Sequence, residues 1–205
     1  MRRLKPPAPD LLEQVVIPAG PIDLGAIFGE CPVVLDVGCA RARYTVKLGE
    51  RYPELGVLGV ENKLKRVLAG AKRVAAAGRE NVRLLCARAE GLFGEILPPA
   101  SVLAAFFICP DPWPKRRHGR RRLFQPDFVE MVRRALVPGG GLFVKTDDPG
   151  YYEWIREVVA GNPRFEPCPE WTAGGTAFDP TITSYYEERH AAEGRETRPL
   201  GWSAR

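Results

Sequence analysis

The residues best suited to chemistry are an acid and an indole that lie between three prolines. Asp111 and Trp113 alternate with these prolines directly after the apolar run 102–109. Because proline restricts the backbone and cannot continue a sheet, we expect both side chains to be presented rigidly at the end of a strand. A carboxylate in that position can stabilise positive charge, and an indole can stack on a nucleobase.

A short strip of positive charge follows this motif. Six of the eight residues 115–122 are Lys or Arg, and none is acidic. Without these six, the chain carries 24 basic against 25 acidic side chains, a net charge of −1. The whole positive excess therefore lies in one place, which is typical of contact with a polyanion such as the backbone of a nucleic acid.

A turn of small residues follows the first apolar run and leads into a helical stretch. Gly38 opens this turn, which lets a ligand approach the backbone and the helix N-terminus. Glu61 ends the next apolar run, where a carboxylate can accept hydrogen bonds from the hydroxyls of an adenosine ribose. Dinucleotide enzymes and methyltransferases share this pairing, and a plain turn with a solvated Glu61 would look the same.

Short apolar runs alternate with stretches of helical periodicity along the chain. This alternation predicts one α/β domain, with a parallel sheet that is covered by helices on both faces. Open sheets of this kind bind ligands beyond the carboxyl ends of their strands, so we expect the motifs above to meet there. The expected strands are 33–37, 56–60, 82–86, 102–109 and 142–145, and the expected helices are 43–52, 64–77, 89–97, 126–136 and 151–159.

The two ends of the chain carry different signals. Residues 1–20 are rich in proline, so we expect a flexible N-terminal arm before a domain that covers 21–205. After residue 164, turn residues and aromatics predict a closing hairpin that pairs 164–171 with 181–187.

Composition narrows the cellular setting. No apolar run approaches the roughly 20 residues of a membrane span, and no apolar segment of a secretory signal follows the basic N-terminus. The five cysteines are an odd number without a CxxC pair, which favours free thiols over disulfides or a metal site. We therefore expect a cytoplasmic protein with no membrane contact and no metal, either a monomer or a homodimer.

The proline-flanked motif also resembles a family signature. Residues 110–118 read Pro-Asp-Pro-Trp-Pro-Lys-Arg-Arg-His, similar to the PDPWPKxRH motif of the bacterial tRNA (guanine-N7)-methyltransferases, which are class I enzymes. Stretches 21–28, 121–128, 138–147 and 184–189 resemble the family in the same order. The resemblance implies a Rossmann-like domain with a mostly parallel seven-stranded sheet. It also implies methyl transfer from S-adenosylmethionine to N7 of a guanine in the variable loop of tRNA.

The resemblance assigns roles to single residues. Asp111 is implied to be catalytic, close to the transferred methyl and the target base. The residues implied to bind the cofactor are Asp36, Gly38, Glu61, Arg88 and Asp111. Those implied to hold the substrate guanosine are Lys115, Asp147, Ser184, Tyr186 and Glu187. Those implied to touch RNA are Arg116, Arg117, His118, Arg120, Arg121 and Arg122.

The chemistry of guanine N7 fits such a site. This atom carries an in-plane lone pair, so no proton has to leave before it attacks a methyl group. Positive charge then moves onto the purine, where carboxylates can stabilise it in a dry pocket. Asp111, Asp147 and Glu187 are the natural candidates, although Asp147 could instead cap a helix and Glu187 could be a surface carboxylate on a strand.

Three positions depart from the family pattern. Ala40 and Ala42 replace glycines of the cofactor turn, at a cost of about 1 kcal/mol if either needs positive φ. Arg88 stands where the family has an acid facing the adenine, and it cannot accept a hydrogen bond from the adenine amino group. Ser184 replaces a threonine and keeps the hydroxyl.

These departures leave two alternatives to an active tRNA methyltransferase. The first is a non-catalytic tRNA-binding relative with a degenerate cofactor site, as Ala40, Ala42 and Arg88 would indicate. The second is a small-molecule methyltransferase, or a nucleotide-dependent oxidoreductase of similar fold, which leaves the basic strip without a purpose. Cofactor titration separates the first alternative from the enzyme, and the salt dependence of tRNA binding separates the second.

Overall fold

The computed structural model describes residues 13–16, 18 and 20–205. Most of the segment expected as a flexible arm, residues 1–12, 17 and 19, lies outside the described residues, as does the side chain of Arg116. Within the described part, one eight-stranded sheet has the order β1-β4-β3-β2-β5-β6-β10-β7, and a small hairpin pairs β8 with β9. The strands are β1 (Val15–Val16), β2 (Val33–Val37), β3 (Gly56–Glu61), β4 (Val82–Cys86), β5 (Val102–Ile108), β6 (Leu136–Thr146), β7 (Phe165–Pro167), β8 (Thr172–Ala173), β9 (Thr176–Ala177) and β10 (Arg198–Ala204).

Neighbouring strands from β1 to β6 run parallel, and β10 runs antiparallel to both β6 and β7. The α-helices are α2 (Leu24–Phe28), α3 (Arg43–Arg51), α4 (Leu64–Ala77), α5 (Ala89–Gly91), α6 (Pro126–Ala135), α7 (Pro149–Ala160) and α8 (Tyr185–Ala192). A π-helical turn, η1 (Leu92–Ile96), continues α5, and a 3-10 helix, η2 (Arg116–Arg121), carries the basic strip. The predicted single α/β domain is confirmed, and each of the five strands and five helices expected before residue 164 has a counterpart.

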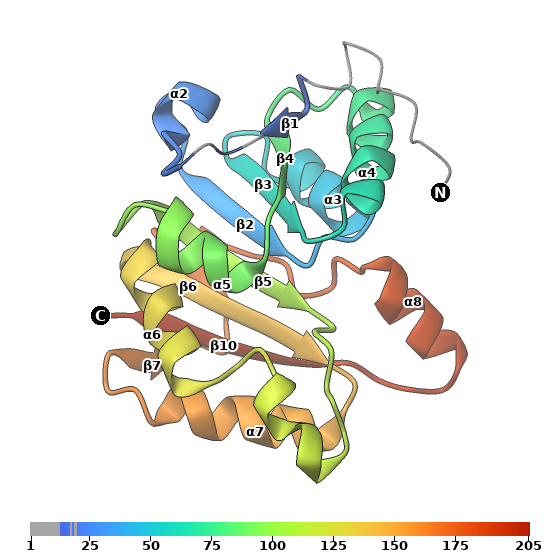
Figure 1. Cartoon of the computed structure of the whole chain (residues 1–205), viewed down its shortest axis with the longest axis vertical. Helices are drawn as coiled ribbons and strands as arrows, with labels where there is room; N and C mark the ends of the chain where they lie inside the picture. Colours follow the sequence, from blue (N-terminus) through green and yellow to red (C-terminus); the bar gives the residue numbers. More distant parts are fainter. Residues whose placement is uncertain (1–12, 17, 19) are drawn as a thin grey trace.

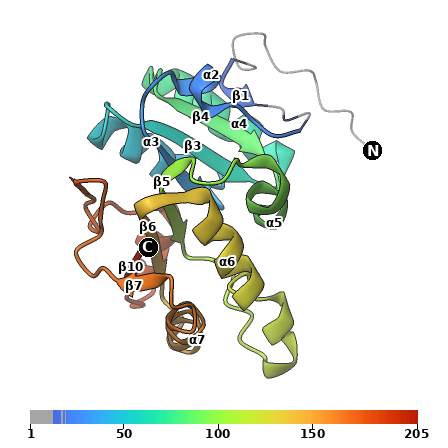
Figure 2. The same cartoon turned by 90° about the vertical axis from the view of Figure 1, so that its left-hand side faces the viewer.

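Helices cover both faces of the sheet (Figures 1 and 2). The strands are buried on both sides because their apolar side chains alternate between two separate cores. In β2, Leu35 packs with residues of α6 and α7 such as Phe128 and Ile155, whereas Val34 packs with α3 and α4. Trp171, from the segment before β8, closes the second core. Because helices cover both faces of the sheet, polar side chains can cluster only at the ends of the strands.

Two sequence-based expectations were wrong in this region. The sheet has eight strands rather than seven, because Val15–Val16 adds a strand beside β4 from within the expected arm. Residues 164–171 and 181–187 do not pair with each other; β7 pairs with β10, and Tyr185–Ala192 is a helix. The helix forms because the Ser184 hydroxyl accepts the Glu187 N–H while the Glu187 carboxylate accepts the Ser184 N–H, a reciprocal cap.

Among the described helices, none is both long and apolar enough to cross a membrane. All five cysteines carry free thiols.

Candidate functional site

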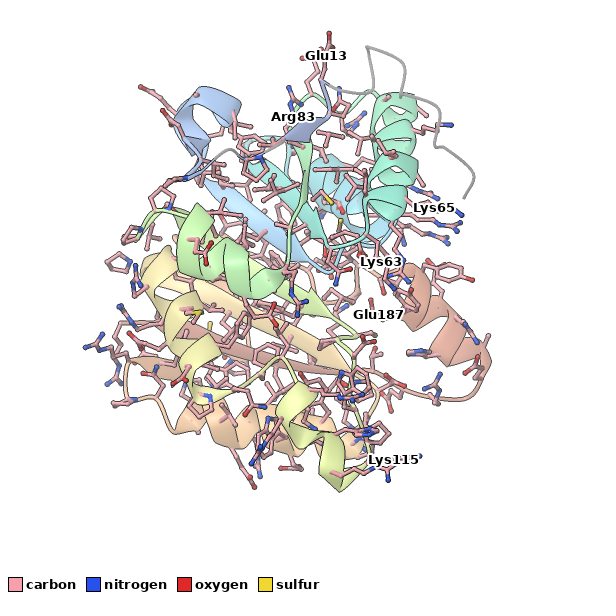
Figure 3. All side chains as sticks on the ribbon, in the orientation of Figure 1. Glu13, Lys63, Lys65, Arg83, Lys115 and Glu187 are labelled. Atoms are coloured by element: carbon pink, nitrogen blue, oxygen red, sulfur yellow. The ribbon has the colours of Figure 1, made fainter. Side chains whose placement is uncertain are left out.

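The order of the strands reverses between β2 and β5, so their carboxyl ends form the crevice in which open α/β sheets bind ligands. Figure 3 shows Lys63, Glu187 and Lys115 along this edge, and α8 lies beside it (Figure 1). The residues predicted for the cofactor and the substrate come mainly from the segments that follow β2, β3, β5 and β6 and from α8. The fold therefore brings the predicted motifs together at the carboxyl edge of the sheet, as expected.

The small-residue turn after β2 has the conformation that a ligand-binding loop needs. Gly38 has φ +86°, and a side chain added there would meet nothing within 4 Å. The N–H groups of Gly38 and Cys39 both donate to the carbonyl of Val60, at 2.8 and 3.0 Å. The backbone of the turn is thus held against β3 while its outer surface stays open to a close neighbour.

Ala40 and Ala42 both adopt left-handed backbone, with φ 51° and 57°. Ala40→Gly is expected to raise the free energy of unfolding by about 0.5–1 kcal/mol, because glycine relieves the strain. Ala42→Gly should be nearly neutral, because the Ala42 methyl is fully buried beside Gly70 and its loss offsets the same relief. Chemical denaturation of both variants measures the difference, and equal effects would contradict this explanation.

Asp36 sits at the end of β2 with only 2% of its surface exposed. It accepts a hydrogen bond of 2.6 Å from the Thr45 hydroxyl of α3. Burial raises the pKa of Asp36 from its ordinary 3.8 to about 7, against the opposing hydrogen bonds from Thr45. Its carboxyl group is therefore engaged inside the fold and is half ionised near neutral pH.

The raised pKa of Asp36 predicts a pH-dependent stability. Since the folded state holds the Asp36 proton more tightly than the unfolded chain does, protonated Asp36 contributes fully to the free energy of unfolding below pH 4. This contribution is lost as the pH rises through about 7. We expect the free energy of unfolding to fall by about 2–3 kcal/mol between pH 5 and pH 8. Asp36→Asn keeps an acceptor for Thr45 but cannot ionise. Its free energy of unfolding, compared with that of the wild type, should therefore rise by the same amount from pH 5 to pH 8. Denaturation curves at both pH values measure it, and a constant difference would refute the shift.

Glu61 ends β3 as a buried, paired carboxylate rather than a solvated one. One oxygen accepts the backbone N–H of Lys63 at 3.0 Å, and the other lies 3.2 Å from the Arg66 guanidinium. Partial burial acts to lower the pKa of Arg66, but the hydrogen bond to Glu61 and the charges of Glu61 and Asp111 raise it. Glu61 therefore holds the Arg66 guanidinium at the end of β3, where the charge of Asp111 also acts on it.

The proline motif separates its two functional side chains. Cys109 and Trp113 adopt left-handed backbone, with φ 52° and 45°. Asp111 is exposed on the crevice side, within electrostatic reach of Arg66. The Trp113 indole is half-buried and packs instead against the basic strip, with the Arg121 guanidinium 5.0 Å above its ring and the His118 ring 5.7 Å away. The acid and the indole thus serve different surfaces.

Arg88 follows β4 and is 77% exposed, with Glu90 as its ion-pair partner at 3.6 Å. It lines a groove of about 560 Å³ together with Trp113 and Arg121. Arg88 was predicted to lie beside the cofactor; the structure places it in this groove.

The basic strip forms η2, and its members have unequal freedom. Lys115, Arg117 and Arg120 are exposed. Arg122, immediately after η2, is held in the fold: its Nε donates to the carbonyl of Pro112 at 3.0 Å, and its guanidinium stacks over two aromatic rings of α7. The exposed members of the strip can meet an anion, whereas Arg122 positions the loop.

The segment Ser184–Glu187, predicted to hold the substrate, lies at the start of α8. The Glu187 carboxylate pairs with Lys145, a partner that the sequence did not predict. Glu187 accepts a hydrogen bond of 2.8 Å from Lys145, and both side chains are at most 4% exposed. Lys145 also donates to the carbonyl of Ile182 at 2.8 Å. Ser184 and Glu187 therefore anchor α8 to β6, while the half-buried Tyr186 lies near Arg66.

A second network, also missed, fastens α8 to α3. Lys47 donates to the Thr183 carbonyl at 2.8 Å and to Glu188 at 3.1 Å. Arg43 pairs with Glu188 at 2.8 Å. Because no sequence motif links α3 with α8, only the fold reveals these contacts.

Asp147, after β6, is a second anchor for α8. Arg195 pairs with it at 2.5 Å, and His190 Nδ1 lies 3.3 Å away without hydrogen-bond geometry. The helix cap considered for Asp147 belongs to Asp148, which accepts the Tyr151 N–H at 2.7 Å.

Cys109, Asp147 and His190 are close enough to be metal ligands, with donor atoms within 4.8 Å of one another. Burial, followed by the charges of Glu187 and Asp147, raises the pKa of Cys109 to about 12. Arg195 pairs with Asp147, and His190 of α8 lies beside the same carboxylate, so these residues connect α8 to the end of β6.

Known proteins resemble this chain over most of its length. A family described as "Putative methyltransferase" matches residues 30–200. The tRNA (guanine-N(7)-)-methyltransferase of Halorhodospira halophila is 35% identical over 188 residues, which are 88% of this chain and 79% of the relative. The chain belongs to the tRNA (guanine-N7)-methyltransferase family. The family's enzyme from Mycobacterium avium (strain 104) is 40% identical over 155 residues, which are 74% of this chain but only 59% of that relative.

The fold of this family member is shared with known methyltransferase structures. The aminoglycoside resistance methyltransferase NpmB1 superposes with a TM-score of 0.62 at 17% identity, over 89% of this chain and 92% of that one. At so low an identity, the similarity shows the common α/β fold alone.

Proposed function

We propose that this chain transfers a methyl group from S-adenosylmethionine to N7 of a guanine in the variable loop of tRNA. The observation that carries the proposal is the placement of the open Gly38 turn, the Glu61–Arg66 pair and Asp111 after the neighbouring strands β2, β3 and β5, at one edge of the sheet. Relatives named for this reaction support it. Since the substrate is tRNA, we place the reaction in the cytoplasm.

The residues after β2 and β3 fit S-adenosylmethionine. The open side of Gly38 allows a ligand to lie against the backbone, and the buried Glu61 carboxylate is suited to ribose hydroxyls. Arg66 occupies one Glu61 oxygen, so the ribose would share that carboxylate with it. When bound, the cofactor supplies an electrophilic methyl on a sulfonium sulfur.

On the substrate side, Asp111 follows β5, which lies next to β2 in the sheet, and its side chain is exposed. We assign it the stabilisation of the positive charge that guanine acquires when N7 takes the methyl. Tyr186 offers an aromatic face beside it. Asp147, Ser184 and Glu187 act through α8: their polar groups are used within the protein, so they hold the helix that presents Tyr186.

The exposed cations of the basic strip supply the RNA contact. Lys115, Arg117, Arg120 and Arg121, with the half-buried His118 among them, lie on the segment that directly follows Asp111, so phosphates bound there would be close to the reacting base. Arg116 belongs to the same helix, and we assign it the same role. A small-molecule methyltransferase would have no use for this segment.

The non-catalytic alternative is less favoured. Ala40 and Ala42 keep the left-handed turn despite the loss of glycine, and Glu61 and Asp111 are both retained at the crevice. The similar proteins carry the names of enzymes.

Incubation of unmodified tRNA with the protein and methyl-labelled S-adenosylmethionine tests the proposal. We expect label at one guanine of the variable loop, detected by strand cleavage at 7-methylguanine. A tRNA with adenine at that position is the matched control and should stay unlabelled. Label at another nucleotide or atom, or no label at all, would refute the proposed reaction.

A further inference from the structure

A groove of about 560 Å³ opens between α5, η2 and α6, beside the crevice. We call it the Arg88 groove. Its lining residues are Arg88, Glu90, Trp113, Arg120, Arg121, Arg122, Leu123, Gln125, Asp127, Phe128 and Met131. Glu61, Arg66, Asp111 and Tyr186 do not line it. Arg88 directly follows Ala87, whose N–H donates to the Glu61 carbonyl at 3.2 Å, so the groove adjoins the donor site.

The groove combines cations with a flat aromatic wall. Arg88 enters from the end of β4, and Arg120 and Arg121 enter from η2. The four arginines of the lining against Glu90 and Asp127 leave a net charge of plus two. Arg122 is already stacked on α7, so the arginines available to a ligand are the other three.

Trp113 gives the groove a second recognition element. Trp113 lines the groove, and the Arg121 guanidinium lies 5.0 Å from the centre of its ring. An indole joined to a guanidinium forms a platform on which bases of any sequence can stack. Arginines beside such a platform can pair with the phosphate of a nucleotide while its base stacks on the platform. The volume of the groove is in the range of small-ligand sites.

From these contacts we infer that the Arg88 groove binds a nucleotide of the tRNA next to the target guanine. Arg88 and Arg120 contact its phosphate, and its base stacks beside Trp113. Arg88 then belongs to the RNA-binding surface and not to the cofactor site. This inference rests on the proposed function, because it takes the RNA substrate from there.

Arg88→Glu tests the inference, since it reverses the charge of the arginine that would contact the phosphate. We expect tRNA binding to weaken about tenfold in roughly 0.1 M salt and the log–log salt slope to become shallower by roughly 0.7–0.9. The affinity for S-adenosylmethionine, measured by calorimetry, should stay within about threefold. Unchanged tRNA binding, or a tenfold change in cofactor affinity, would overturn the inference.

Two further variants test the charge and the stacking separately. Arg134→Glu makes the same charge change at an exposed arginine at the opposite end of α6, and should leave the salt slope unchanged. Trp113→Leu should weaken tRNA binding severalfold without altering the slope, because stacking releases no counterions. If the wild type methylates tRNA and Arg88→Glu binds it equally well, the inference alone fails. If the wild type binds no tRNA, the proposed function fails with it.

Discussion

Replacing Asp111 by alanine is expected to lower kcat for tRNA methylation by about a hundredfold to a thousandfold. Asp111 is the exposed carboxylate on the crevice side of the proline motif, within reach of the Arg66–Glu61 pair. Removing it takes away the negative charge that stabilises the methylated purine as it forms. Single-turnover transfer of labelled methyl to tRNA measures the effect separately from product release.

Asp111→Asn distinguishes charge from shape. It retains the size and the backbone of the proline motif but loses the charge, so we expect nearly the same loss as with alanine. Glu80→Ala removes an exposed acid at the opposite end of β4 and should leave the rate unchanged. If Asp111→Asn keeps more than a third of the wild-type rate, charge stabilisation by Asp111 is excluded.

Breaking the buried Lys145–Glu187 pair is expected to cost about 3–5 kcal/mol of folding free energy. In Glu187→Ala, the Lys145 ammonium would remain 3% exposed without its carboxylate, and α8 would lose half of its cap. The cost arises from an unpaired buried charge, not from the intrinsic strength of the pair. Urea denaturation at neutral pH measures the loss.

Two comparisons isolate this effect. Lys145→Met combined with Glu187→Gln removes both charges while glutamine can still cap Ser184, so the double variant should lose less stability than Lys145→Met alone. Glu153→Ala breaks an exposed pair with Arg156 and should cost below about 1 kcal/mol. A similar loss from the buried and the exposed pair would show that burial is not the cause.

Much of the fold could be read from the sequence because its strands are buried on both faces. The runs 33–37 and 82–86 are β2 and β4 to the residue, since each is a short apolar run with one charged side chain, Asp36 or Arg83. The C-terminal part was misread because its turn residues and aromatics were taken as signs of a hairpin. The pair Ser184 and Glu187, spaced as in a capping box, was the signal that could have predicted the helix.

The candidate site was predictable only where a local motif carries it. Gly38, Glu61 and Asp111 lie at the predicted edge because strand ends place them there. Lys145 could not be found, since it pairs with a residue 42 positions away. The separation of Asp111 from Trp113 depends on left-handed backbone at Trp113, which the proline before it and the proline after it do not reveal.

The crevice is a working methyl-donor site only if it binds S-adenosylmethionine despite Ala40, Ala42 and Arg88. Calorimetric titration of the cofactor into the whole protein measures this directly. We expect one molecule to bind per chain, and Glu61→Ala to weaken its binding at least tenfold. No binding heat at millimolar cofactor would contradict the assignment.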